Sequence, residues 1–469
     1  MIFNSLLAVV LLSPLPLASN RPWSWSLCAL LIACISVCSA LSVFTKNAPP
    51  YNWRRFMAVV DICLVFILVL AWSAVQALWQ APMEYLHPLW DMTFKLLGGN
   101  HPATISLAPD DTLTSIMRLL AYGLTFWLAY FYCQHLENAQ RVVYGLMLAG
   151  VIYCVYGLVI YFGDYQTILW FDKFNYLNDL TSTFISRNHF ATYAGLTLLC
   201  AFTMLTESVV QSSKYHIGGN IGLQRFLEQL VSRSWGPLLA FFIIGTALLL
   251  THSRGGFFSS VFGLGVLLLL TYLYQFLQRG SSVSFGTNFL MLLTLALIFF
   301  ASLMFFFSSD GLMRRLDDIG LDSEGRIVVY DLTWQAIQSN PWIGFGLGSF
   351  KQVFPLYKTL EIGGSDQNPI LWDYAHNTYL ECAFELGIPA ALGLFYCIGR
   401  LALMCIFGAF RRKRNMIYPA LGFSATVLIA AHASVDFSMQ IPAVPLTYML
   451  LMGAACAQTF NSNKRRESH

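Results

Sequence analysis

Four short polar segments interrupt an otherwise apolar chain, and each carries residues that bind anions or move protons. They are SRNH (186–189), THSRGG (251–256), EGR (324–326) and YAHN (374–377). Arginine at a membrane boundary is unfavourable unless it meets an anion or water, and its planar guanidinium suits bidentate contact with phosphate. Arg187, Arg254 and Arg326 together therefore predict a pocket for a dense anion such as a diphosphate. Gly255 and Gly256 are expected to let backbone N–H groups approach that anion.

His376 is the candidate for proton transfer, because imidazole titrates near neutral pH. It lies in the YAHN step just before an apolar span, a position that leaves a structural and a catalytic role equally open. His189 and His252 are expected to be local hydrogen-bonding partners at helix ends. A single arginine fits contact with lipid headgroups as well as substrate binding, so the interpretation depends on several converging.

The composition sets these segments in a membrane protein. Of 469 residues, 57% are hydrophobic and 11% are charged, and the mean hydropathy is +0.60. Soluble domains carry about 25% charged residues. A net charge of +3 without a basic, aromatic-rich patch excludes a nucleic-acid partner. The cysteines form no CxxC pair and no metal-spaced cluster, so neither a disulfide framework nor a metal site is expected.

Apolar runs near the ~20 residues that cross a bilayer predict an all-α polytopic protein with about twelve transmembrane helices. The expected spans are 2–18, 25–44, 57–79, 113–133, 142–162, 190–205, 236–251, 257–277, 288–307, 387–407, 417–435 and 441–460.

The loops between these spans predict the orientation. Lysine and arginine are most concentrated at 411–414 and in the C-terminal tail, so both termini are expected to be cytoplasmic, with the polar segments on the other side of the bacterial inner membrane. The chain then divides into a first bundle (1–307), a large helical periplasmic loop between the ninth and tenth spans (308–386), and three last spans with a cytoplasmic tail (387–469).

The long loop is expected to have structure of its own. Apolar spacing predicts a helix over 325–339 with Ser323 as its N-cap, and Asn340-Pro341 should end it. GFGLG (344–348) predicts a tight turn, after which Ser349 is expected to cap a second short helix reaching residue 357. A loop this long with its own helices is usually functional.

In this order, SRNHFA (186–191), THSRGG (251–256), EGR…YDLTWQAI…NPWIGFGLGSF (324–350) and AHNTYLECAFELGIP (375–389) resemble the O-antigen ligase and polymerase superfamily. That superfamily also contains O-oligosaccharyltransferases acting on pilins. The resemblance implies a metal-independent, cofactor-free glycosyltransferase of the all-helical membrane class (GT-C-like). Such enzymes move a glycan from undecaprenyl diphosphate to a hydroxyl in the periplasm.

Carried over residue by residue, the resemblance implies that Arg187 and Arg254 hold the diphosphate, with Arg326 contributing from the loop. It implies that His376 is the base or orienting group at the acceptor hydroxyl. Supporting roles follow for the neighbours in the motifs, namely Asn188, His189, Asn377 and Glu385.

The acceptor stays open at this point. It is the lipid A core for a ligase, a growing polysaccharide for a polymerase, and a protein for an oligosaccharyltransferase; the segment 433–442 favours polysaccharide assembly. The rival class is a lipid-linked oligosaccharide flippase or another polytopic transporter. Transporters more often show internal repeats and buried midplane acids. A non-catalytic envelope scaffold is a third interpretation, disfavoured by the arginines and histidine of the loop.

Overall fold

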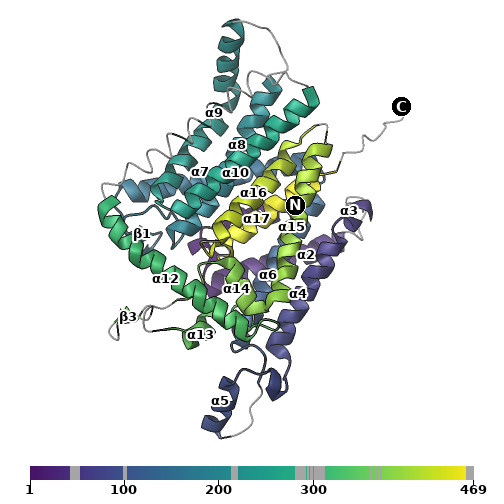
Figure 1. Cartoon of the computed structure of the whole chain (residues 1–469). Helices are drawn as coiled ribbons and strands as arrows, with labels where there is room; N and C mark the ends of the chain where they lie inside the picture. The colour runs from purple at the N-terminus through teal and green to yellow at the C-terminus, as the bar shows by residue number, and fades with distance from the viewer. Residues whose placement is uncertain are drawn as a thin grey trace.

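The computed structural model describes residues 1–42, 53–98, 103–212, 220–279, 292, 295, 299, 312–359, 362, 364–365, 368–369, 372–412 and 414–460. Nearly all regular structure in these residues is helical (Figure 1). Two small antiparallel hairpins, β1–β2 (Thr167–Ile168 and Phe171–Asp172) and β3–β4 (Gly364–Ser365 and Asn368–Pro369), accompany the helices. The predicted helical class is therefore confirmed for the described residues.

Among the described residues, seven helices are long and apolar enough to cross a membrane. They are α2 (Pro22–Ser42), α4 (Val60–Leu78), α6 (Pro109–Tyr132), α7 (Leu136–Phe162), α8 (Arg187–Ser212), α10 (Arg254–Arg279) and α15 (Ile388–Arg411). Shorter apolar helical stretches occur in α1 (Ile2–Leu12), the second half of α9 (Asn220–Leu250), α16 (Ile417–Ala433) and α17 (Ala443–Ala457).

These seven and four stretches together overlap eleven of the expected spans. The expected ninth span, 288–307, lies outside the described residues except for 292, 295 and 299, so the count of twelve and the placement of the loop after the ninth span stay predictions. The first span is shorter than expected. α1 ends at Leu12 because Pro14 and Pro16 cannot continue a helix, and a 3-10 turn, η1 (Leu17–Ser19), follows.

The bundle is built around α8, α16 and α17, whose side chains are buried almost throughout. α8 packs against α7, α9, α10 and α16, while α17 lies along α6. Small residues allow these close approaches. A Cβ added at Gly453 of α17 would lie 2.5 Å from both the Ala129 Cβ and the Phe126 carbonyl oxygen of α6. Helices α2 and α4 are peripheral, and their exposed leucines suit contact with lipid.

Smaller elements connect and cover the bundle. They are α3 (Trp53–Met57), η2 (Met83–Tyr85), α5 (Leu89–Leu97), α12 (Leu312–Ser339), α13 (Phe350–Val353), η3 (Phe354–Leu356), α14 (Thr378–Leu386) and η5 (Ser438–Gln440). Figure 1 shows α5, α12, α13 and α14 gathered at one end of the bundle, whereas α3 and the last described C-terminal residues lie toward the other.

The predicted loop helix exists, but it begins earlier than expected. α12 starts at Leu312, so Ser323 lies inside the helix and the prediction that it is the N-cap is wrong. The helix ends at Ser339, immediately before Asn340-Pro341, as predicted. Local periodicity found the second half of the helix. Leu312, Leu316 and Ile319 also recur at helical spacing, but Gly320 and Gly325, which disfavour a helix interior, weaken the helix signal between the two halves.

The glycine turn also forms as predicted, with positive φ at Gly344, Gly346 and Gly348. A Cβ at Gly344 would lie 2.4 Å from the Glu385 carbonyl oxygen, so the turn packs directly on the end of α14. Ser349 occupies the N-cap position of α13, as predicted, and the helix continues through η3 to Leu356, close to the predicted end at 357. The predicted side-chain cap is wrong, however, because the Ser349 hydroxyl donates to the Gly346 carbonyl (2.7 Å). The turn thereby closes on itself, and a small apolar core around Phe345, Phe350 and Phe384 fastens it to α14.

Candidate functional site

Two helix N-termini, those of α8 and α10, meet at the loop end of the bundle. Ser186 precedes α8 and its hydroxyl accepts a hydrogen bond from the Asn188 N–H (3.3 Å), while the Ser253 hydroxyl accepts from the Gly256 N–H (3.2 Å). The Ser253 hydroxyl also donates to the Asn188 side-chain oxygen at 2.8 Å. The SRNH and THSRGG segments, far apart in sequence, are therefore joined side chain to side chain.

Asp179 links the same two segments a second time. One carboxylate oxygen lies 2.8 Å from an Arg187 guanidinium nitrogen, and the other lies 2.8 Å from the His252 Nδ1. The Arg187 guanidinium also lies over the Tyr176 ring, 5.3 Å from its centre. Its buried Nε has no hydrogen-bond partner among the described residues. Arg187 is thus held in position by one carboxylate and one ring, with donor capacity remaining.

Gly255 and Gly256 both serve the packing of α10. The Gly256 N–H is already bonded to Ser253, and a Cβ at this residue would lie 2.3 Å from the Ala191 Cβ of α8. A Cβ at Gly255 would lie 3.0 Å from the His432 ring of α16. The pair therefore permits α10 to pack tightly between α8 and α16. The Gly256 N–H is already bonded to Ser253, whereas the approach of the Gly255 N–H to an anion stays a prediction.

Asp436, between α16 and η5, is the buried centre of the site. Its carboxylate accepts from the Asn188 amide (3.2 Å) and the Ser438 hydroxyl, and lies 3.8 Å from the His189 Nε2. Burial raises the pKa of Asp436, but the nearby His189 and His432, the Ser438 hydrogen bond and His376 outweigh it, so the pKa lies below its usual value. The carboxylate stays ionised.

His376 lies against the same 436–437 segment. Its ring packs edge-on against Phe437, with ring centres 4.7 Å apart, and against Trp372 at 5.6 Å. Its backbone has a positive φ of 54°, and the Tyr330 hydroxyl of α12 donates to its carbonyl at 2.9 Å. The strained backbone and these contacts hold the imidazole beside Asp436. The two side chains interact electrostatically, because His376 is one of the groups that lower the pKa of Asp436.

Asn377 and the next turn support this position. The Asn377 side-chain oxygen caps α14 by accepting from the N–H groups of Tyr379 and Leu380, at 3.0 and 3.1 Å. The Thr378 hydroxyl donates to the Asp436 carbonyl at 3.0 Å. α14 therefore begins at the candidate base and is tied directly to the Asp436 segment.

Two buried acids of α14 lie behind His376. Glu381 accepts from the Ala375 N–H (2.8 Å) and from Gln440 (3.0 Å), whereas Glu385 accepts from the Phe350 N–H (3.2 Å). Burial and the charge of Glu385 raise the pKa of Glu381 well above its usual value, and burial raises that of Glu385 to about 7. Glu381 thus fixes the backbone next to the histidine, while Glu385 anchors the glycine turn.

The remaining two arginines approach from different elements. Arg254 is the first residue of α10 and is exposed. Arg326 lies on α12, one turn before Tyr330. Burial raises the pKa of Tyr330, and the positive charge of Arg326 opposes that shift, which places the guanidinium close to the residue that holds His376. Both arginines therefore lie near the joined segments.

Sequence reasoning missed the carboxylates that organise the site, Asp179, Asp436 and Glu381. Asp179 lies shortly before SRNH, Glu381 shortly after YAHN, and Asp436 within the 433–442 segment. Their closeness in sequence to these segments is the signal that could have identified them. Glu385, predicted to support the histidine, acts one step further away, through the glycine turn.

No group of three or more His, Cys, Asp or Glu side chains suited to a metal ion occurs in the part of the chain that is described. Metal independence stays a prediction.

The comparisons with known proteins bear on this same region. A family model described as O-Antigen ligase matches residues 239–395, about a third of the chain, from α9 into α15. The match includes Arg254, Arg326 and His376. No curated protein matches the chain. The family match confirms the predicted resemblance to the O-antigen ligase superfamily over these residues.

Proposed function

We propose that this protein is a membrane glycosyltransferase of the O-antigen ligase or polysaccharide polymerase type. It transfers a glycan from an undecaprenyl-diphosphate carrier to an acceptor hydroxyl on the periplasmic face of the bacterial inner membrane, with both termini cytoplasmic. The observation that carries the proposal is the junction of three segments at one end of the bundle: Asn188 binds Ser253 and Asp436, and His376 lies against Phe437.

The arginines suit the departing diphosphate. As the bond between the anomeric carbon and the diphosphate oxygen breaks, negative charge grows on that oxygen. Guanidinium groups that are already oriented stabilise such charge without reorganisation. Asp179 and Tyr176 hold Arg187 in position, and its Nε has no hydrogen-bond partner among the described residues. Arg187 can therefore bind the departing diphosphate without first being ordered. Arg254 and Arg326 would add charge from α10 and α12.

His376 suits the acceptor. The hydroxyl oxygen forms a bond to the anomeric carbon while its proton passes to the imidazole, and the electron pair of the broken bond leaves with the diphosphate. A single displacement of this kind inverts the anomeric centre. A positioned base contributes about 10²- to 10⁴-fold to such a reaction. The ionised Asp436 nearby would stabilise the imidazolium that results.

The test is transfer by the purified full chain from an undecaprenyl-diphosphate oligosaccharide, with EDTA present, to lipid A core, to a second lipid-linked glycan or to a protein acceptor. His376→Ala and Arg254→Ala should each lose transfer. His135→Ala, in the connection between α6 and α7, and Arg21→Ala, an exposed arginine before α2, should retain it. All four variants should insert and unfold like the parent.

Full transfer by both His376→Ala and Arg254→Ala would refute the catalytic proposal. Movement of the lipid-linked glycan across the membrane without any transfer product would favour the flippase instead. The acceptor that becomes glycosylated distinguishes a ligase from a polymerase and from a protein oligosaccharyltransferase.

A further inference from the structure

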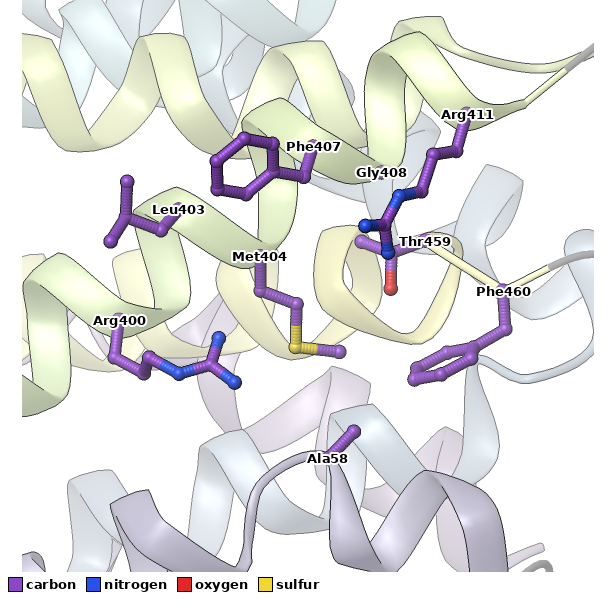
Figure 2. A pocket seen from close by; sticks show the side chains of 9 residues that line it. All are labelled: Ala58, Arg400, Leu403, Met404, Phe407, Gly408, Arg411, Thr459 and Phe460. Carbon is purple, nitrogen blue, oxygen red and sulfur yellow. The ribbon is translucent and has the colours of Figure 1, made fainter.

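A second feature with ligand-binding character lies at the end of the bundle opposite the candidate site. A cavity of about 580 Å³ opens between the α3–α4 corner, the last turns of α15 and the end of α17. α15 runs from the α14 junction to Arg411, so this cavity lies at the far end of that helix from His376. Figure 2 shows the guanidinium groups of Arg400 and Arg411 pointing toward the middle of the space from opposite sides.

One face of α15 forms the wall. Arg400, Leu403, Met404, Phe407 and Arg411 recur at helical spacing, so two cations bracket an apolar strip. Leu403 is 49% exposed and Phe407 is 57% exposed, which leaves the strip open to the hydrocarbon of a membrane. This combination of cations within an apolar wall matches a molecule that carries an anion and alkyl chains.

The floor of the cavity depends on a close approach between α15 and the end of α17. A Cβ at Gly408 would lie 2.5 Å from the Thr459 Cβ, so only glycine permits this contact. Arg55 donates to the Ala457 carbonyl (2.9 Å) and its guanidinium lies over the Phe460 ring, 5.1 Å from the ring centre. The cavity is therefore a built feature with ordered walls.

The charges around the cavity do not cancel. Arg400 is paired through its Nε with Asp61 at 3.1 Å, and Arg412 donates to the carbonyls of Gln458 and Phe460. Arg411 is exposed and has no hydrogen-bond or ion-pair partner among the described residues.

We propose that this cavity binds an anionic phospholipid, with the phosphate between Arg400 and Arg411 and the acyl chains leaving over Leu403 and Phe407. Basic pockets between membrane helices recognise lipid phosphates in this way, and anionic lipids are attracted to juxtamembrane basic residues. The site is separate from the candidate catalytic residues, so the inference does not depend on the proposed function.

The experiment measures phospholipid binding to the purified full chain by native mass spectrometry in a non-ionic detergent. Phosphatidylglycerol, phosphatidylcholine and inorganic phosphate are the probes. Arg411→Gln removes the unpaired charge, and Arg414→Gln is the matched control, since Arg414 is exposed at the same end but does not line the cavity. Ala58→Trp fills the space from the α3–α4 corner while leaving every charge in place.

Phosphatidylglycerol should bind about tenfold more weakly to Arg411→Gln and to Ala58→Trp than to the parent, a loss of about 1.4 kcal/mol in binding free energy. Its affinity for Arg414→Gln should stay within about twofold of that for the parent. Phosphatidylcholine should bind the parent as weakly as phosphatidylglycerol binds Arg411→Gln, and millimolar inorganic phosphate should not compete. Equal losses in Arg411→Gln and Arg414→Gln, unchanged binding to Ala58→Trp, or displacement by inorganic phosphate would each overturn the proposal.

Discussion

Gly256→Ala is the perturbation that tests most directly how helix packing supports the site. Gly256 is buried near the start of α10, and the added Cβ would lie 2.3 Å from the Ala191 Cβ of α8. Carbon atoms in contact prefer about 3.5–4.0 Å, so the helices would have to separate by roughly 1.2–1.7 Å. Neither atom can rotate away, because each Cβ is fixed to a helix backbone.

The expected effects on stability and on transfer differ in size. Overpacking of this kind destabilises a core by about 1–3 kcal/mol. Displacing α10 also pulls Ser253 from Asn188, a contact of 2.8 Å, and carries Arg254 away from the N-terminus of α8. Because a misplacement of about 1 Å can lower a rate about 10²-fold, transfer should fall by roughly that factor while most of the protein stays folded at 25 °C.

Gly265→Ala on the same helix is the matched control, since nothing lies within 4 Å of its added Cβ. The same substitution there should leave transfer unchanged and should not lower the midpoint of thermal unfolding, because alanine favours the helix by up to about 1 kcal/mol. Both variants are assayed for unfolding in detergent and for transfer after reconstitution. Equal unfolding midpoints and equal transfer rates for Gly256→Ala and Gly265→Ala would refute the packing argument.

Two further predictions concern the buried acids. The folded pKa of Glu385 is raised to about 7 from 4.5, so the unfolded chain loses its proton first, and stability should fall as pH rises between those values, by up to about 3 kcal/mol. Glu385→Gln should flatten this decline in thermal unfolding measured from pH 4.5 to 8, and an identical pH profile would count against it. Asp436→Asn should lower the transfer rate at least tenfold. The part of the pH–rate profile in which the rate rises with pH should also move to lower pH, because His376 loses a nearby negative charge. An unchanged position of this rise would exclude the electrostatic role of Asp436.

Much of the architecture could be predicted because it depends on local properties of the chain. Length and apolarity of the runs placed helices at eleven of the expected spans, and Asn340-Pro341 marked the end of α12. The glycines of GFGLG adopt positive φ as a tight turn requires. The start of α12 was missed although Leu312, Leu316 and Ile319 have helical spacing, because Gly320 and Gly325 weaken the helix signal between the two halves. The hydrogen bond from Ser349 back to its own turn depends on the turn geometry, which the sequence pattern does not specify.

The amino-acid sequence by itself determined that the chain is a helical membrane protein and which polar segments are candidates for chemistry, since composition and motif order need no folding. Only the tertiary structure decided which side chains meet. Asn188 and Asp436 are 248 residues apart yet hydrogen-bonded, and Asp179 joins Arg187 to His252. Gly256 likewise serves the packing of α10 on α8. Such pairings follow from how helices pack in three dimensions, which no local pattern specifies.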